Sequence, residues 1–165
     1  MKNKTFDWFF PSFCEKEKIS LNKLLKSNFL NEGSLTKKFE DKIAKYLNVK
    51  YAVCVTSGTI ALALALLANG VRRSDKVLTS NFTFVATANA VTLIGAKPIF
   101  VDITKEDFTI DTNKITPLIK DGVKAIISVD VNGRACDYKK LEKISRDYNI
   151  PLISDSAEAL GSKYN

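Results

Sequence analysis

The sequence predicts an α/β fold in which a mostly parallel sheet has helices on both faces, and two observations predict it. From Lys50 onward, short runs rich in β-branched residues alternate with amphipathic or apolar stretches of helical length, which is the pattern of a parallel sheet. Each helical stretch is also long enough to make a right-handed crossover between parallel strands. With 165 residues and a hydrophobic content of 45%, the chain can bury one core and not two.

The expected elements follow one another along the chain. The strands are residues 51–55, 76–79, 97–101, 124–129 and 151–154. The helices are residues 16–26, 36–47, 58–68, 84–94, 113–119 and 137–148. In the second helix, Phe39, Ile43 and Leu47 keep helical spacing, so we expect this stripe to pack on the core. Cys54 lies in the first, apolar strand and is expected to be a small core residue.

Missing or scarce residue types exclude several functions. The chain has no histidine, which excludes hydrolases with a histidine base and most zinc hydrolases. Its cysteines, Cys14, Cys54 and Cys136, are odd in number and widely spaced, so neither a disulfide framework nor a metal site is expected. The loops lack the Walker lysine pattern and the G-x-G-x-x-G fingerprint, which argues against a nucleoside triphosphate or NAD.

Charge and hydropathy bear on partners and location. The net charge is +7, but the lysines are spread along helix faces with acids between them, so solvated faces are favoured over a nucleic-acid surface. The longest apolar run, residues 60–68, is about half as long as a membrane span. The first residues of the chain include no apolar stretch of the kind that a signal peptide has. We therefore expect a cytoplasmic protein that binds neither nucleic acid nor membrane.

In open parallel sheets, ligands bind beyond the carboxyl ends of the strands, and three such places carry polar or aromatic side chains. The first, residues 56–59, reads Thr-Ser-Gly-Thr and opens an apolar helix. It offers hydroxyls, a glycine and the free amides of a helix N-terminus, which suit a phosphate group. An ordinary N-cap is the alternative, and it is favoured when this loop is considered alone.

The other two places supply a ring and a charge. Phe82 and Phe84 follow a strand, where one ring could stack on a flat heteroaromatic ligand; packing in the core is the alternative. Asp155 ends an apolar strand, where a poorly solvated carboxylate calls for a positive partner such as a protonated pyridine nitrogen; a turn cap is the alternative. A phosphate cradle, a stacking ring and a carboxylate on successive strand ends are what pyridoxal 5'-phosphate requires.

With these residues in place, the sequence resembles the DegT/StrS family of sugar aminotransferases, which are fold-type-I pyridoxal-phosphate enzymes. The resemblance covers nearly the whole chain and is carried by residues 33–40, 57–59, 83–90, 95–102 and 155–162. It implies a truncated large domain of that fold over residues 36–165, preceded by a helical segment over residues 1–35. Departures from the family pattern stand at Ser74, Ser80, Asn132 and Ser154.

The resemblance also implies roles for individual residues. Gly58, Thr59 and the Ile60 amide would hold the cofactor phosphate. Phe84 would stack on the ring, and Asp155 would pair with the pyridine nitrogen.

Glu158 would lie near the phenolic oxygen of the cofactor, as the resemblance implies for its position. The family moves an amino group, usually from glutamate, to a keto group of a nucleotide-linked sugar. For this chain the resemblance favours a 4-keto-6-deoxyhexose as the acceptor. It also implies a homodimer. The Schiff-base lysine is expected beyond Asn165, so no catalytic residue is assigned and the chain alone is expected to be inactive. A non-catalytic cofactor-binding or partner module is the alternative, ahead of a generic nucleotide-binding domain.

Overall fold

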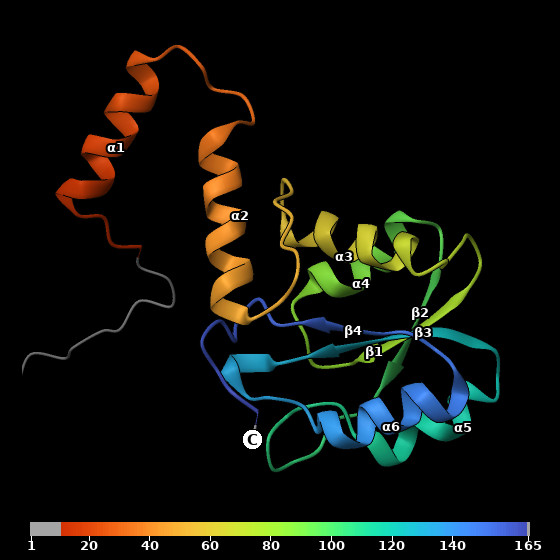
Figure 1. Cartoon of the computed structure of the whole chain (residues 1–165). Coiled ribbons are helices and arrows are strands. Elements are labelled where there is room, and N and C mark those ends of the chain that lie inside the picture. Colours follow the sequence, from red (N-terminus) through yellow and green to blue (C-terminus); the bar gives the residue numbers. More distant parts are fainter. Residues whose placement is uncertain (1–10, 165) are drawn as a thin grey trace, which may run out of the picture. The chain divides into compact units, whose positions relative to one another are not determined.

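The computed structural model describes residues 11–164, and the chain divides into two compact units after Cys54. The first unit holds the helices α1 (Glu15–Lys26) and α2 (Ser34–Leu47), and the second holds the sheet and the other helices (Figure 1). The sequence places the boundary after residue 35. That predicted division into residues 1–35 and 36–165 stays a prediction.

In α2, Phe39 and Leu47 are exposed and Ile43 is partly buried, and the packing of this stripe on the core stays a prediction. Two expectations for residues 51–55 are wrong. Residues 51–55 form no strand, and the Cys54 amide donates to Glu40 Oε1 at 2.8 Å. Cys54 is exposed and is therefore not a core residue.

The second unit is built on a sheet of four strands within the described residues, in the order β2-β1-β3-β4, and every neighbouring pair is parallel. The strands are β1 (Lys76–Ser80), β2 (Lys97–Val101), β3 (Val123–Val129) and β4 (Leu152–Asp155). All residues of β3 except Lys124 are buried, as expected for a strand covered on both faces. The predicted parallel sheet is confirmed, and these strands end within one residue of their expected bounds.

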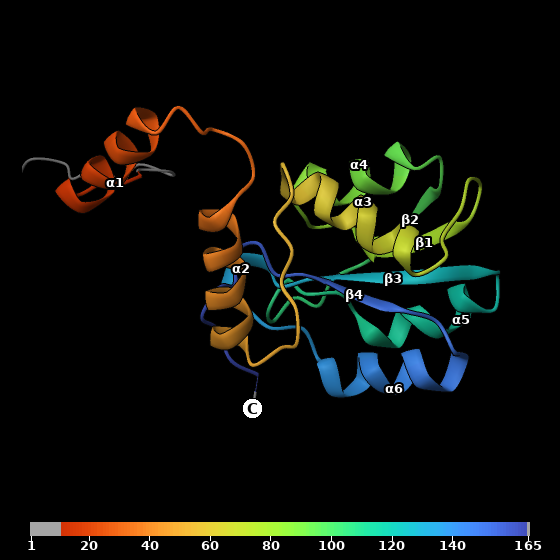
Figure 2. The same ribbon diagram turned by 45° about the horizontal axis from the view of Figure 1, so that its top comes forward.

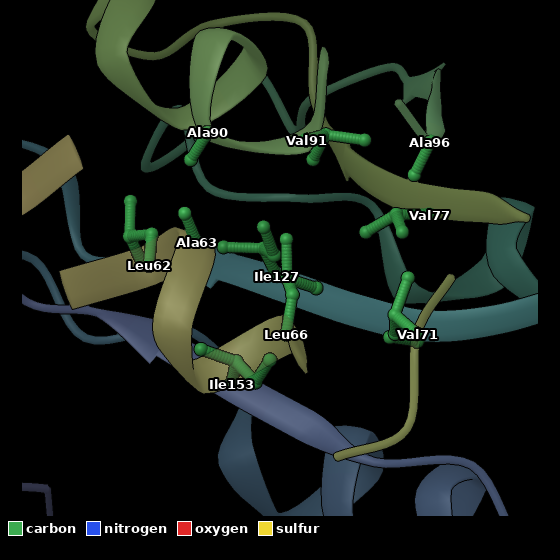
Figure 3. Close-up of a cluster of buried hydrophobic side chains, with 11 residues drawn as sticks. Leu62, Ala63, Leu66, Val71, Val77, Ala90, Val91, Ala96, Ile127 and Ile153 are labelled. Carbon is green, nitrogen blue, oxygen red and sulfur yellow. The ribbon is translucent and has the colours of Figure 1, made fainter. Parts of the chain in front are cut away.

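Helices cover both faces of this sheet (Figures 1 and 2). They are α3 (Gly58–Ala68), α4 (Val85–Leu93), α5 (Ile115–Ile119) and α6 (Tyr138–Tyr148). Because side chains alternate along a strand, Val77 of β1 packs with α3 and α4, and Leu78 packs with α5 and α6. Figure 3 shows the first cluster, in which Leu66 of α3 lies near Ile127 of β3 and Ile153 of β4. Two separate apolar clusters therefore hold the helices on the sheet.

Short turns and left-handed residues complete the unit. A 3-10 turn, η1 (Thr112–Lys114), precedes α5, and a second, η2 (Val131–Gly133), follows β3. Ser74 has a φ of 71° and Asn132 a φ of 53°. The left-handed region costs a residue with a side chain about 1–2 kcal/mol relative to glycine, and asparagine tolerates it best. This explains why glycine would suit position 74 better than the serine found there.

The chain changes direction at β1. It passes from β1 through α4 to β2 on one side, and then through α5 to β3 on the other side of β1. Such a switch leaves a crevice outside the carboxyl ends of the strands. Those ends are Ser80 of β1 and Val129 of β3, with Asp155 of β4 paired to Val129. A ligand site is therefore expected at this edge of the sheet.

Candidate functional site

A cavity of about 360 Å³ lies at this edge. Its wall is formed by the first turns of α3 and α4 and by residues at the ends of β3 and β4. Small-molecule sites span roughly 300–1,000 Å³, so the space suits one cofactor-sized ligand. Five of the six residues singled out in the sequence line it, namely Gly58, Thr59, Phe84, Asp155 and Glu158. The structure thus brings them together, while their contacts with a ligand stay predictions.

The first turn of α3 presents unpaired amides to the cavity. Ser57 is the N-cap, and its Oγ accepts a hydrogen bond from the Ile60 amide at 3.3 Å. Among the described residues, no protein acceptor faces the amides of Gly58 and Thr59. A Cβ added at Gly58 would meet no atom within 4 Å, so the glycine leaves open space beside these donors. The arrangement suits an anionic group at the positive end of a helix.

Ile60 is the exception among the predicted residues. It does not line the cavity, and its amide already donates to Ser57. The N-cap that was the alternative interpretation of this loop therefore exists, but it uses only the third amide of the turn. The amides of Gly58 and Thr59 have no such partner among the described residues, and the predicted phosphate contacts of all three residues stay predictions.

Phe84 is the aromatic side chain that reaches the cavity. It is the N-cap of α4 and is 71% exposed, so the core-packing alternative is wrong for this ring. Phe82 instead packs against Phe108, with 5.8 Å between ring centroids, and does not line the cavity. One ring of the pair is thus free to cover a flat ligand.

Asp155 ends β4 with a carboxylate that two groups contact. Thr87 Oγ1 donates to Oδ2 at 2.7 Å, whereas the Ala157 amide lies 3.4 Å from Oδ1. The second distance exceeds that of an ordinary N–H···O bond, so Asp155 is a poor turn cap. Its Oδ1 remains open to a donor from the cavity.

Glu158 also lines the cavity, and its side chain forms a hydrogen bond within the protein. Its Oε2 accepts a 2.6 Å hydrogen bond from the Asn132 amide, which holds η2 at the end of β3. Glu158 is exposed, and this hydrogen bond holds its carboxylate beside the cavity. A contact with a phenolic oxygen stays a prediction.

Asp130 is a cavity residue that the sequence analysis missed. It directly follows β3, which is the position where the other candidates were sought, so the same rule identifies it. Its side chain accepts from the Cys136 amide at Oδ1 (3.0 Å) and from Tyr138 and Ser156 at Oδ2 (2.8 and 2.6 Å). Ser154 adds a longer contact of 3.3 Å to Oδ2.

The groups around Asp130 are neutral donors. Asp130 is only 5% exposed, and a buried carboxylate needs hydrogen bonds to offset its lost hydration. Burial and the nearby Asp130 charge raise the pKa of the Cys136 thiol to about 12, so it stays protonated at neutral pH. Burial likewise raises the pKa of the Tyr138 hydroxyl, which keeps it a donor. Asp130 thus ties the ends of β3 and β4 to α6.

The charged groups on the cavity wall are all acidic. Among the residues that the structure describes, Asp130, Asp155 and Glu158 line it, whereas no lysine or arginine does. In the part of the chain that the structure describes, no group of three or more acidic, cysteine or histidine side chains is placed to hold a metal ion. None of the helices in residues 11–164 combines the length and apolar character needed to cross a membrane. With free amides at one place and carboxylates at another, the cavity favours a ligand that has both an anionic and a cationic group.

Known proteins share this architecture. GDP-perosamine synthase of Escherichia coli O157:H7 is 39% identical over 155 residues, which is 93% of this chain and 43% of that protein. The solved aminotransferase from Psychrobacter cryohalolentis has a TM-score of 0.90 at 32% identity, over 93% of this chain and 40% of its own. NtdA from Bacillus subtilis, solved with the bound cofactor PMP, has a TM-score of 0.86 at 32% identity, over 89% and 34%.

The chain therefore spans less than half the length of these relatives. The aminotransferase fold predicted from the sequence is confirmed by these structures, and the predicted cofactor class is the one bound in NtdA. Residues 11–165 match the family model described as the DegT/DnrJ/EryC1/StrS aminotransferase family. The chain belongs to the DegT/DnrJ/EryC1/StrS aminotransferase family.

Proposed function

We propose that this chain forms the cofactor-binding part of a pyridoxal-phosphate-dependent aminotransferase that acts on a nucleotide-linked keto sugar. The observation that carries the proposal is the distribution of groups around one cavity: free amides at α3, the exposed ring of Phe84, and the open carboxylate oxygen of Asp155. A matching ligand has an anionic group, a flat ring and a cationic nitrogen. Pyridoxal phosphate and pyridoxamine phosphate have all three.

Each residue would contribute one physical task. The amides of Gly58 and Thr59 would bind the phosphate, helped by the dipole of α3. Phe84 would cover one face of the ring and exclude water from it. Asp155 would stabilise a proton on the ring nitrogen, because an opposite charge nearby favours the charged form. When bound, the cofactor supplies the electron sink for the carbanion formed at the Cα of the amino donor.

The substrate class is inferred from the relatives. Similarity to GDP-perosamine synthase supports a nucleotide-linked sugar as the amino acceptor, and the sequence resemblance supports a 4-keto-6-deoxyhexose with glutamate as the donor. None of the lysines in residues 11–164 lines the cavity, so the lysine that this reaction needs would come from another part of the protein or from a second subunit. A homodimer and a cytoplasmic location stay predictions.

A non-catalytic module that holds the cofactor is the second candidate. The same observation favours it, namely the absence of lysine from the residues that line the cavity. Such a module would share every contact described above with the enzyme. The two candidates differ only in whether a lysine reaches the cofactor.

Titration of the purified chain with pyridoxamine phosphate tests the binding site, because this form of the cofactor needs no covalent attachment. Saturable binding is expected. Pyridoxamine, which lacks the phosphate, should bind at least about tenfold more weakly, because it loses charge-assisted hydrogen bonds to the α3 amides. Isothermal titration calorimetry measures both. Equal binding of the two compounds would contradict the proposed phosphate site.

Treatment with pyridoxal phosphate and borohydride then separates the two candidate functions. Specific labelling of one lysine would show that the chain carries its own nucleophile and favour the enzyme. Scattered or absent labelling, together with saturable binding of pyridoxamine phosphate, would favour a module or an enzyme completed by another polypeptide segment.

A further inference from the structure

A buried hydroxyl contacts the carboxylate that the proposed function assigns to the ring nitrogen. Thr87 lies in the first turn of α4 and is fully buried. Its Oγ1 donates to Asp155 Oδ2 at 2.7 Å, although 68 residues separate the two. Within the described residues, no other side chain donates to this carboxylate. The orientation of Asp155 therefore depends on one hydroxyl from a different element.

The hydroxyl belongs to a chain with a defined direction. Thr83 Oγ1 lies 2.7 Å from Thr87 Oγ1, and either atom could donate on geometry alone. A carboxylate oxygen only accepts, so the single proton of Thr87 goes to Asp155. Thr83 must then donate to Thr87, in preference to its longer 3.3 Å contact with the Phe84 carbonyl. Aligned hydroxyls of this kind polarise one another and strengthen the last bond.

The two oxygens of Asp155 are thereby given different tasks. Oδ2 is held by Thr87, and Oδ1 has only the long contact to the Ala157 amide. On the opposite side of the strand, Ser154 and Ser156 both turn to Asp130, as the alternation of side chains along an extended chain requires. The end of β4 is thus fixed on both sides, and Oδ1 of Asp155, a residue that lines the cavity, can accept a further hydrogen bond.

We propose that Thr87 is a positioning residue, which orients the Asp155 carboxylate so that Oδ1 receives the ring nitrogen of the cofactor. The inference rests on the proposed function, because it assumes that Asp155 meets this nitrogen. Phe84 is the N-cap of α4 and Thr87 is the third residue of the helix, and the Thr87 amide donates to the Phe84 carbonyl at 3.1 Å. The start of α4 therefore positions both the Phe84 ring, which would cover the cofactor, and the Asp155 carboxylate, which would contact the ring nitrogen of the cofactor.

Two ligands of the same shape isolate this effect. The chain is titrated with pyridoxamine phosphate and with its analogue in which a C–H group replaces the ring nitrogen. Both carry the same phosphate and ring area, so general damage to the cavity weakens both equally. The ratio of their dissociation constants reports only on the nitrogen contact. The wild-type chain should prefer pyridoxamine phosphate by about tenfold or more, as expected for a hydrogen bond to a charged group.

In Thr87→Val, which removes the hydroxyl and keeps the side-chain shape, this preference should fall to about twofold or less. Thr87→Ser restores the donor and should restore the preference. Thr92→Val is the matched control, because Thr92 is on the same helix, is exposed, and bonds only to the Asn89 carbonyl; its ratio should equal that of the wild type. Circular dichroism verifies the folding of each variant.

If a folded Thr87→Val variant has the same ratio of the two dissociation constants as the wild type, the inference is overturned and the proposed function is left intact. Absence of any preference in the wild-type chain would overturn the contact between Asp155 and the nitrogen, and the inference with it. If Thr87→Val does not fold, Thr83→Val removes the preceding donor. A severalfold smaller ratio in that variant supports the hydroxyl chain, and an unchanged ratio overturns it.

Discussion

Replacing Asp155 by asparagine is expected to weaken the binding of pyridoxamine phosphate by about tenfold to a hundredfold, because a charged hydrogen bond contributes about 1.5–3 kcal/mol. The asparagine keeps an oxygen for Thr87 and nearly the same volume, so the fold should persist. Affinity for the analogue without the ring nitrogen should not fall, since that ligand offers no proton for the carboxylate. Calorimetric titration of both ligands measures the effect.

Asp147→Asn is the control for this substitution. Asp147 is an exposed carboxylate on α6, where it pairs with Lys143, and it is not part of the cavity wall. Its loss should leave both affinities unchanged. Equal weakening of the two ligands by Asp155→Asn would mean that Asp155 supports the cavity as a whole and does not contact the nitrogen.

Replacing Asp130 by alanine is expected to lower the free energy of unfolding by about 3 kcal/mol, because buried donors that lose their acceptor cost about 1–3 kcal/mol each and water offsets part of this. The Cys136 amide would lose its side-chain acceptor, and the hydroxyls of Tyr138 and Ser156 would keep only their contacts with neighbouring serines. Urea denaturation followed by circular dichroism measures the change.

Asp147→Ala again provides the comparison, since the substitution is chemically the same at an exposed site. Its effect should stay within about 0.5 kcal/mol of the wild type. A loss below about 1 kcal/mol for Asp130→Ala would contradict the role assigned to this carboxylate, and would indicate that water replaces it among the donors.

The sheet could be predicted from the sequence because its strands are buried on both faces. Such strands appear as short apolar runs between helical stretches, and β1 to β4 were found at their expected places. Residues 51–55 have the same composition, and yet they form no strand. A local sequence pattern does not tell whether a neighbouring strand is available for pairing. In this segment the Cys54 amide donates to the Glu40 side chain.

The candidate site could be predicted in outline because one topological rule places it. Strand ends converge at the switch point, so Gly58, Phe84 and Asp155 come together from distant positions. The hydrogen bonds within the site depend on the three-dimensional positions of the side chains, which the spacing of residues along the sequence does not predict. Asp130 also follows a strand, so the same rule indicates it, whereas Thr87 lies within an apolar helical run and gives no such signal.

The most direct test is a crystal structure of the chain with pyridoxamine phosphate bound. The phosphate should lie within hydrogen-bond distance of the Gly58 and Thr59 amides, the ring against Phe84, and its nitrogen beside Oδ1 of Asp155. A cofactor bound outside this cavity, or bound within it with the nitrogen turned away from Asp155, would contradict the site described above.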